Sequence, residues 1–251
     1  MGRGLTLGRP LSVALETGST NDDALAAARA GASHGATFVA EYQTRGRGRR
    51  GHVWHAEPGT NLLCSIVVGP GLPLEATPAL ALAAGLAVRS AIAAAPGLGD
   101  AADERVRVKW PNDVWLDQKK VAGVLSESQI QGGALIASVV GIGINVGPRA
   151  FPAEIAANAT SLVLSGSTVS REALLVEVLA ALESTLWRLA RGGVLALHDD
   201  LTRYDALAGR PVRVEDIEGV ASGIDATGRL LVRLRSGELR ALTGGSVELI
   251  A

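Results

Sequence analysis

The stretch Gly46-Arg47-Gly48-Arg49-Arg50-Gly51, preceded by Arg45 and followed by Trp54, decides how the rest of the chain is interpreted. Glycines let a backbone bend sharply and approach a ligand closely, and arginines bind phosphate oxygens through charge-assisted hydrogen bonds. The spacing also satisfies the dinucleotide pattern G-x-G-x-x-G, but that pattern needs small residues and a helix directly after it. Here arginines fill the pattern, and Pro58-Gly59 prevents a helix. The stretch therefore predicts a phosphate-binding loop outside a Rossmann fold.

The composition of the chain limits the class of protein. Its 251 residues suffice for one main domain and a small second one. The net charge of -1 argues against a general nucleic-acid binder or a basic RNA-binding module, which carry a broad basic surface. The single cysteine, Cys64, excludes an internal disulfide and a multi-cysteine metal site. No signal peptide opens the chain, so we expect a cytoplasmic protein that does not cross a membrane.

The lysines are confined to one part of the sequence. Of the 24 basic residues, only Lys109, Lys119 and Lys120 are lysines. A lysine supplies a compact ammonium group where an arginine supplies a planar fork, so their confinement indicates a site that needs the ammonium. Chance clustering is the alternative.

The first half of the chain predicts strands and helices around the arginine loop. We expect a strand over 11–15, followed by a helix that Ser19-Thr20-Asn21 begins and Gly31 ends. Helix capping would engage one of these three polar residues and leave the other two for a ligand. Strands over 36–42 and 61–68 flank the loop, and a long apolar helix over 77–94 is expected to be a buried scaffold.

The second half predicts a hairpin and then a change of architecture. Strands over 106–110, 114–116 and 120–127, joined by a turn at Pro111-Asn112-Asp113, bring Lys109, Asp113 and Lys120 together. Surface salt bridges, usually worth under about 1 kcal/mol each, are the simpler explanation of that cluster. A strand over 134–144 contains Gly141 and Gly143, where a backbone or ligand can approach closely.

The C-terminal third combines helices with a small β-rich region. An amphipathic helix over 170–191 and a short helix near 195–207 precede five short strands between 211 and 250. This pattern predicts a main α/β domain over 1–205 and a small β-barrel over 206–251.

Taken together, five motifs resemble the biotin protein ligase family, in the order in which that family carries them. They are Ser19-Thr20-Asn21, Gln43 with the loop 46–51 and Trp54, Lys109-Trp110-Pro111-Asn112-Asp113-Val114, Lys120-Val121-Ala122-Gly123, and Gly141-Ile142-Gly143-Ile144-Asn145-Val146. The resemblance implies a mixed β-sheet catalytic domain of the biotin/lipoate ligase, class II synthetase-like type, followed by a C-terminal SH3-like β-barrel. Because only about eighteen residues precede Ser19, we expect the monofunctional type without a DNA-binding domain and no DNA partner.

The resemblance also implies a two-step reaction. Biotin and MgATP give biotinyl-5'-AMP and pyrophosphate, and a lysine of a biotin carboxyl carrier protein then becomes biotinylated. ATP and Mg²⁺ would be a substrate and its metal, with no tightly bound prosthetic group. A lipoate or octanoate ligase of the same fold is the alternative, but a dithiolane ring needs no polar set like Ser19, Thr20, Asn21 and Gln43.

The residues of the motifs take their roles from the same resemblance. Arg49 and Lys120 are the expected catalytic residues, bridging the biotin carboxylate and the α-phosphate. The expected biotin site is Ser19, Thr20, Asn21, Gln43, Arg47, Gly48, Arg49, Lys120 and Gly123. The expected nucleotide site is Arg49, Trp54, Lys109, Asn112, Asp113, Lys120 and Asn145, with magnesium near Asn112 and Asp113.

The loop itself departs from the family pattern at two positions. His52 stands where the family usually has a basic residue, and Arg45 stands where an alanine is common, so Arg45 is expected to compensate for a neutral imidazole. A loop over 45–56 that is mobile without ligand and closed with it would protect a mixed anhydride from water. We expect Arg45 and Arg50 to be solvated charges.

Overall fold

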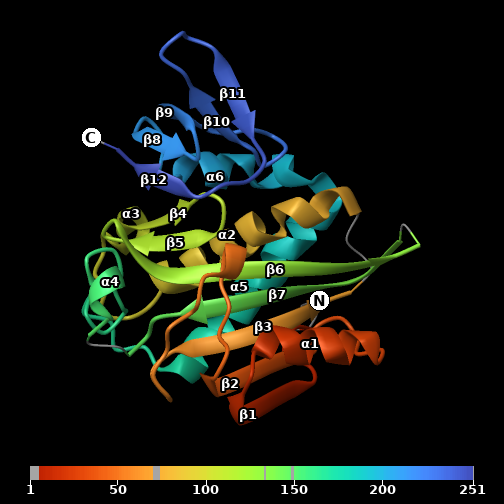
Figure 1. Cartoon of the computed structure of the whole chain (residues 1–251). Coiled ribbons are helices and arrows are strands. Elements are labelled where there is room, and N and C mark those ends of the chain that lie inside the picture. Colours follow the sequence, from red (N-terminus) through yellow and green to blue (C-terminus); the bar gives the residue numbers. More distant parts are fainter. Residues whose placement is uncertain (1–5, 70–73, 133, 148–149, 251) are drawn as a thin grey trace.

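One mixed β-sheet organises the larger part of the molecule. The computed structural model describes residues 6–69, 74–132, 134–147 and 150–250. Within them a seven-stranded sheet has the order β1-β2-β3-β7-β6-β5-β4 (Figure 1). Only β1 and β2 pair in parallel, and the other neighbours are antiparallel. The strands are β1 Leu11–Thr17, β2 Thr37–Gln43, β3 Leu62–Val68, β4 Val106–Lys109, β5 Asp113–Leu116, β6 Lys119–Gln131 and β7 Ala134–Ile144. The predicted mixed α/β sheet is confirmed.

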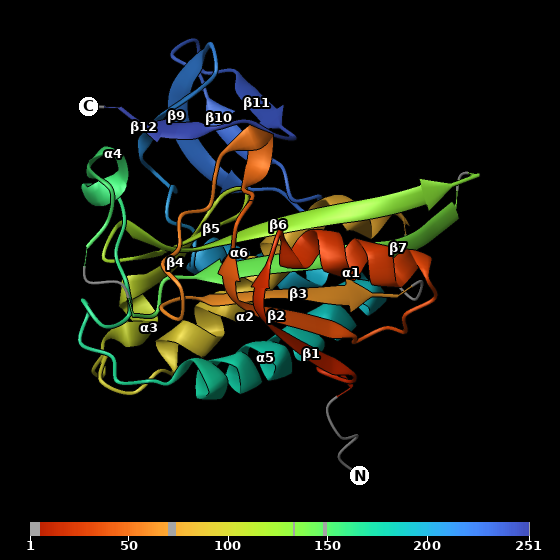
Figure 2. The ribbon, with the colours of Figure 1, turned by 60° about the horizontal axis from the view of Figure 1, so that its bottom comes forward.

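Helices cover both faces of this sheet. Helix α1 (Thr20–Arg29) packs on one face through Ala24 and Ala28, which join a small apolar cluster with β3 and β7. Helices α2 (Leu80–Ala93) and α5 (Arg171–Gly192) pack against each other on the opposite face and fill the main core (Figure 2). Short helices α3 (Ala102–Arg105), α4 (Ala153–Ala156) and α6 (His198–Arg203) and the 3-10 turns η1 (Arg49–Gly51), η2 (Leu74–Ala79) and η3 (Val194–Leu197) complete the helical elements.

Helix α2 is a core helix although its composition would suit a membrane. The window Ala76–Ala93 is long and apolar enough to span a bilayer, but 72% of it is buried inside the protein. Its Arg89 is 3% exposed and donates to the carbonyl of Val106 at 3.1 Å. The scaffold role predicted for this segment therefore agrees with its burial.

Several element boundaries differ from the sequence prediction. The helix expected over 77–94 begins only at Leu80, after a 3-10 turn that contains Pro78. The helix expected over 195–207 is a 3-10 turn followed by α6, which ends at Arg203. Strand β6 continues past Glu127 to Gln131, since β7 pairs with it along that whole length.

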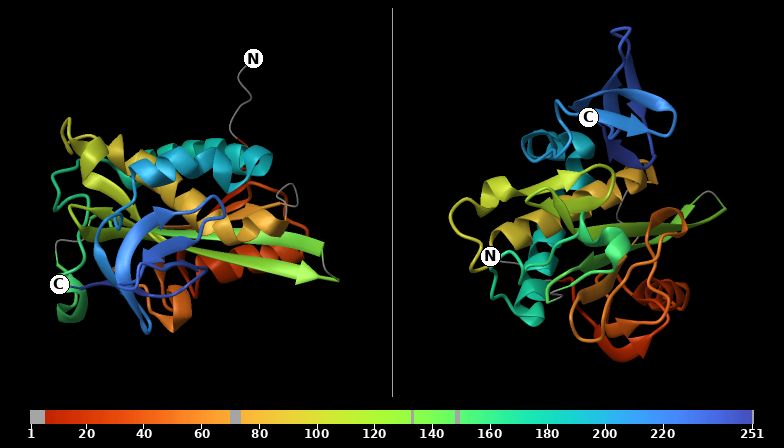
Figure 3. Two further views of the ribbon diagram at one scale, coloured as in Figure 1. Left: turned by 90° about the horizontal axis from the view of Figure 1, so that it is seen from above. Right: turned by 60° about the vertical axis from the view of Figure 1, so that its left-hand side comes forward.

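The C-terminal part forms a second, five-stranded antiparallel sheet with the order β11-β10-β9-β8-β12. Its strands are β8 Pro211–Val214, β9 Ile217–Ile224, β10 Leu230–Arg233, β11 Leu239–Leu242 and β12 Val247–Leu249. This agrees with the predicted small SH3-like barrel. The barrel lies beside β4 and β5, at the opposite edge from β1 (Figures 1 and 3). The division of the chain at 205/206 stays a prediction, and residues 1–5 and 251 of the two predicted domains lie outside the described residues.

A short connecting segment joins the two sheets. Residues 204–206 run along β4, where Val108 donates to the carbonyl of Tyr204 at 2.8 Å and Ala206 donates to that of Val108 at 2.9 Å. The carboxylate of Asp205 accepts from the amide of Leu207 at 2.8 Å, while its Oδ2 is buried without a partner among the described residues. Burial raises the pKa of Asp205 to about 6, against the lowering effect of the hydrogen bonds from Leu207 and Ala208.

We expect Asp205→Asn to stabilise the protein at neutral pH. The folded state holds the Asp205 proton up to about pH 6, whereas the unfolded chain releases it near pH 4. The contribution of Asp205 to stability is therefore fully present below about pH 4 and is lost as the pH rises through about 6. At pH 7.5 the substitution should raise the free energy of unfolding by about 1 to 3 kcal/mol.

The measurement is urea unfolding of both proteins from pH 4.5 to 8, with the exposed Asp216→Asn as the matched control. The gain from Asp205→Asn should shrink toward pH 4.5. A gain that does not change with pH would contradict the titration of Asp205.

Candidate active site

All of the residues expected in the biotin and nucleotide sites line one cavity. The cavity has a volume of about 1040 Å³ and lies where the loop after β2, the start of α1 and the ends of β4 to β7 meet. Its lining includes Ser19, Thr20, Asn21, Gln43, Arg47, Gly48, Arg49, Trp54, Lys109, Asn112, Asp113, Lys120, Gly123 and Asn145. The structure thus brings together residues from every predicted motif, while their individual roles in binding stay predictions.

The polar residues at the start of α1 are more constrained than the sequence indicated. Ser19 is the N-cap residue but forms no side-chain cap hydrogen bond, so the expected division into one capping and two free residues is wrong. The backbone amide and hydroxyl of Thr20 both donate to Oε1 of Gln43, at 2.7 and 3.1 Å. Asn21 is 4% exposed and is held by neighbouring strands. The wall of the cavity is therefore a fixed hydrogen-bonding surface.

The predicted hairpin places opposite charges at one end of the sheet. Lys109 and Asp113 are paired positions on β4 and β5, and Nζ of Lys120 lies 2.7 Å from Oδ1 of Asp113. Burial, together with the nearby Lys120, lowers the pKa of Lys109, against the raising effect of Asp113. The expected grouping of Lys109, Asp113 and Lys120 is confirmed.

Two cations in this wall have no acid of their own. Within the described residues, neither Arg49 nor Lys109 forms an ion pair with a carboxylate. Arg49 donates only to Oδ1 of Asn112, at 3.3 Å, and its pKa is lowered by burial and then by Arg50. Desolvated cations without a carboxylate partner are costly, and an anion in the cavity would relieve that cost. The electrostatics therefore favour an anionic ligand.

The floor of the cavity is made of glycine backbone under an indole ring. A Cβ atom at Gly143 would lie 2.6 Å from Cε2 of Trp54, and one at Gly123 would lie 3.1 Å from Cζ3. The ammonium of Lys120 lies 5.6 Å from the centroid of the same ring. The indole N–H is buried and has no partner among the described residues. A side chain at Gly143 would thus displace Trp54 from the floor, and one at Gly123 would crowd the ring.

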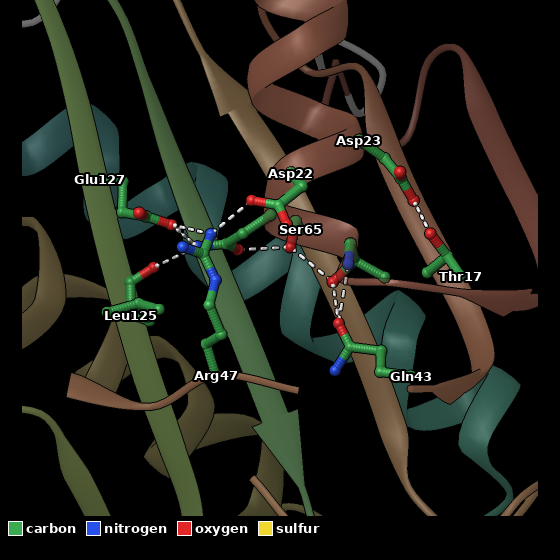
Figure 4. Close-up of polar contacts among 10 residues, drawn as sticks. Thr17, Asp22, Asp23, Gln43, Arg47, Ser65, Leu125 and Glu127 are labelled. Carbon is green, nitrogen blue, oxygen red and sulfur yellow. Dashed lines mark hydrogen bonds and ion pairs between the residues drawn. The ribbon is translucent and has the colours of Figure 1, made fainter. Parts of the chain in front are cut away.

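The arginine loop is held from two sides. Arg47 pairs with Asp22 of α1 at 2.6 Å and with Glu127 of β6 at 3.1 Å (Figure 4). Arg50, which has a left-handed backbone at φ 55°, pairs with Glu215 of the barrel at 2.5 Å. The expectation that Arg50 is only a solvated charge is therefore wrong, because the barrel supplies a carboxylate that the sequence does not place near it. Arg45 and His52 are exposed.

Comparison with known proteins places this architecture in a family. Residues 19–145 match the profile described as Biotin/lipoate A/B protein ligase family, and residues 208–250 match the Biotin protein ligase C terminal domain. The biotin–[acetyl-CoA-carboxylase] ligase of Mycobacterium tuberculosis is 37% identical over 232 residues, covering 88% of this chain and 82% of that protein. The chain belongs to the biotin protein ligase family.

Other members of the ligase family have similar sequences and structures. The bifunctional ligase/repressor BirA of Bacillus spizizenii is 32% identical over 92% of this chain and 71% of its own length. The structure of the biotin protein ligase of Aquifex aeolicus in complex with biotin and ATP has a TM-score of 0.74 at 26% identity, covering 96% of this chain and 99% of that one. The ligase of Leishmania major with biotinyl-5-AMP gives a TM-score of 0.62 at 25% identity, covering 93% and 99%.

The ligase cavity has no ready-made metal cluster in the described part of the chain. No group of three His, Cys, Asp or Glu side chains there is arranged to hold a metal ion. The expected magnesium ligands are engaged with protein groups, since Asp113 faces Lys120 and the Nδ2 of Asn112 donates to the carbonyl of Val124 at 2.8 Å. Asn145 is likewise fixed, donating to the carbonyl of Thr160 at 3.1 Å.

Sequence reasoning missed several residues of the ligase site. Residues 245–249 of the barrel also line the cavity, together with Trp115, Phe151 and Ile155. Ser65, inside the apolar strand β3, and Glu127, at the end of a predicted strand, connect to the polar wall. A hydroxyl in an otherwise apolar buried strand was the one available signal for Ser65.

We expect Glu215→Gln to loosen the arginine loop. Removing the charge leaves Arg50 without its barrel partner, and exposed pairs of this kind shift an equilibrium by up to about fivefold. Trypsin should therefore cut within residues 45–50 about two- to fivefold faster, as measured by mass spectrometry of the fragments. Biotin with ATP should slow the cleavage in both proteins.

The control is Glu218→Gln, which breaks a barrel ion pair with Arg213 at 2.7 Å that does not involve the loop. High salt should reduce the difference between the wild type and Glu215→Gln, because it screens exposed charges. Equal cleavage rates of the wild type and Glu215→Gln at low salt would show that the Arg50–Glu215 ion pair does not hold the loop. Cleavage that biotin with ATP does not slow would contradict a loop that closes on its ligand.

Proposed function

We propose that this chain activates biotin with ATP as biotinyl-5'-AMP and transfers the biotinyl group to a lysine of a biotin carboxyl carrier domain. The observation that carries the proposal is the pair of desolvated cations, Arg49 and Lys109, without carboxylate partners beside a fixed polar wall. The cations suit a nucleotide's phosphates, and the wall suits a small ligand with few polar groups in an apolar pocket.

In the first step, a carboxylate oxygen of biotin attacks the α-phosphorus of ATP and the bond to pyrophosphate breaks. Both reactants are negatively charged, so cations between them lower the barrier. We assign this role to Arg49 and Lys120. Asp113 neutralises Lys120 at 2.7 Å, and ligand phosphates would compete for that ammonium.

The proposed biotin wall comprises Ser19, Thr20, Asn21 and Gln43, with Arg47, Gly48 and Gly123 around it. The Oε1 of Gln43 already accepts from Thr20, which leaves its Nε2 as a donor for the ureido carbonyl. Because Arg47 is bound by two carboxylates, we assign its contribution to the loop backbone and to loop position. Trp54 would cover the ligand from the glycine floor.

In the second step, the ε-amine of the acceptor lysine attacks the acyl carbon, the bond to AMP breaks, and an amide forms with release of a proton. The acceptor is proposed to be a carrier domain of acetyl-CoA carboxylase or a related carboxylase, in the cytoplasm. Two relatives that match over most of this chain are named biotin–[acetyl-CoA-carboxylase] ligases.

Magnesium is proposed to arrive with ATP. Mg²⁺ usually binds proteins through one or two carboxylates and keeps its other ligands as water and phosphate oxygens. Asp113 and the carboxamide oxygen of Asn112 would supply these ligands on exchanging their contacts with Lys120 at 2.7 Å and Arg49 at 3.3 Å, and Asn145 and Lys109 would position the nucleotide around the metal. The metal would neutralise phosphate charge when bound.

The decisive measurement is biotin-dependent exchange of labelled pyrophosphate into ATP. We expect exchange with biotin and none with lipoate or octanoate, because these acids lack the ureido group that the polar wall would bind. Absence of exchange with biotin would reject the proposed function, and equal exchange with lipoate would favour the alternative substrate.

Arg49→Ala and Lys120→Ala should each lower the exchange rate. A charge-assisted hydrogen bond to phosphate contributes roughly 1.5 to 3 kcal/mol, which corresponds to about ten- to a hundredfold. Lys119→Ala is the matched control, because Lys119 precedes Lys120 but is exposed and does not line the cavity. Near-normal exchange in both site variants would contradict the roles assigned to them.

A further inference from the structure

A carboxylate of the barrel lines the ligand cavity, although the proposed ligand is a polyanion. Among the described residues that line the cavity of about 1040 Å³, only Asp113 and Glu248 are acidic. Its basic lining consists of Arg47, Arg49, Arg50, Lys109 and Lys120, besides two histidines. Asp113 forms an ion pair with Lys120 at 2.7 Å, whereas neither step of the proposed reaction uses Glu248. Glu248 is therefore the acid of the cavity that remains available to a ligand.

Strand β12 directs the side chain of Glu248 away from the barrel core. The preceding residue, Val247, is 4% exposed and belongs to the core. Because successive side chains of a strand point to opposite faces, Glu248 points outward, and its side chain is 67% exposed. Its cross-strand neighbour Arg213 approaches Oε2 only to 3.8 Å and has a closer partner in Glu218 at 2.7 Å. The charge of Glu248 is thus weakly compensated and reachable from the cavity.

Glu248 ends a row of alternating charges along one wall of the cavity. Lys120 of β6 contacts Asp113 of β5, and Asp113 is the cross-strand partner of Lys109 on β4. Burial is the main cause that lowers the pKa of Lys109, and the nearby carboxylates of Asp113 and Glu248 oppose it. Positive and negative side chains therefore alternate from β6 through β5 and β4 to β12. Glu248 lies at the barrel end, and Lys120 lies at the end assigned to the reacting groups.

The charge of Glu248 limits which part of a nucleotide can lie against it. A carboxylate repels phosphate oxygens, so it suits a part of the ligand without negative charge. Ribose hydroxyls meet this condition, because they donate charge-assisted hydrogen bonds to carboxylates, as they do to the acid of dinucleotide-binding folds. In ATP the ribose is attached to the α-phosphate. With the α-phosphate at Lys120 and the nucleotide continuing past Lys109, the ribose comes next, beside Glu248.

The cavity lining also offers an apolar surface for the base beyond the ribose. Trp115, Phe151, Ile155 and Leu249 line the same cavity. Leu249 directly follows Glu248, and Nζ of Lys109 lies 5.0 Å from the ring centroid of Trp115. Glu248 thus adjoins both the cationic row and the apolar lining, as a ribose adjoins both phosphate and base.

We propose that Glu248 is a specificity-determining residue that accepts hydrogen bonds from the ribose hydroxyls of the nucleotide. The inference rests on the proposed function, since the nucleotide is taken to be ATP. It gives the barrel a part in selecting the substrate, because Glu248 belongs to β12 and not to the catalytic sheet.

The experiment compares ATP with 2',3'-dideoxy-ATP, which keeps the base and the phosphates but lacks both hydroxyls. The ratio of the two kcat/KM values in biotin-dependent pyrophosphate exchange measures the preference for the ribose. The wild type should prefer ATP by about tenfold or more, which is the effect of a hydrogen bond to a charged group. A change that acts on the phosphates, on Lys109 or on folding alters both rates alike and leaves the ratio unchanged.

Two variants of Glu248 and one matched control apply this ratio. Glu248→Ala should reduce the preference for ATP to about twofold or less, because the acceptor is gone. Glu248→Gln keeps an uncharged acceptor oxygen and should reduce the preference at least about threefold. The control Glu218→Gln removes the closer acid of Arg213 on the same sheet but does not line the cavity, so it should keep the wild-type ratio.

The outcomes distinguish the inference from the proposed function. If the wild type catalyses no exchange with biotin and ATP, the proposed function fails. If it uses both nucleotides equally well, or if Glu248→Ala keeps the full preference, the ribose contact is overturned. A variant that keeps the preference but slows only the transfer to the carrier domain would place Glu248 at the acceptor lysine and overturn it as well. Should Glu248→Ala not fold, an unchanged ratio in Glu248→Gln overturns it equally.

Discussion

The constraint on which the rest of the structure depends is that two half-buried cations must be kept without acids of their own. Burial lowers the pKa of both Arg49 and Lys109, so the folded protein bears the cost of holding them in place. The neighbouring carboxylates form ion pairs with other cations: Asp113 with Lys120, and Asp22 and Glu215 with arginines of the loop. The sheet and loop therefore hold uncompensated positive charge in the cavity, which an anionic ligand would neutralise. Such preorganisation favours reaction between two negatively charged substrates.

The C-terminal barrel helps to form the cavity and to hold the arginine loop. The indole of Trp110, next to the cavity, donates to the carbonyl of Gly228 at 3.0 Å, and Glu215 reaches the loop from the same side. Residues 245–249 add a wall that the catalytic sheet does not supply. Movement of the barrel would therefore disturb the loop and the nucleotide side of the cavity together, which couples the two sheets mechanically.

Local patterns in the sequence were sufficient for much of this description. The turn at Pro111-Asn112-Asp113, the flanking strands and the glycine-rich loop follow from short-range preferences, and the motif residues they carry reach one cavity. Glu127 and Glu215 were beyond such reasoning, because their partners lie 106 and 165 residues away and depend on strand register and on barrel placement.

The confinement of lysine to one strip has a consequence for the protein's own chemistry. An acyl-adenylate acylates any accessible amine, so an enzyme that makes one is exposed to modification by its own intermediate. Here two of the three lysines, Lys109 and Lys120, line the cavity, and only Lys119 stands exposed. The other cations of the chain are arginines, protonated at any physiological pH, so the described surface offers only one exposed lysine amine to intermediate that escapes. The choice of cation thus limits self-acylation without any added structure.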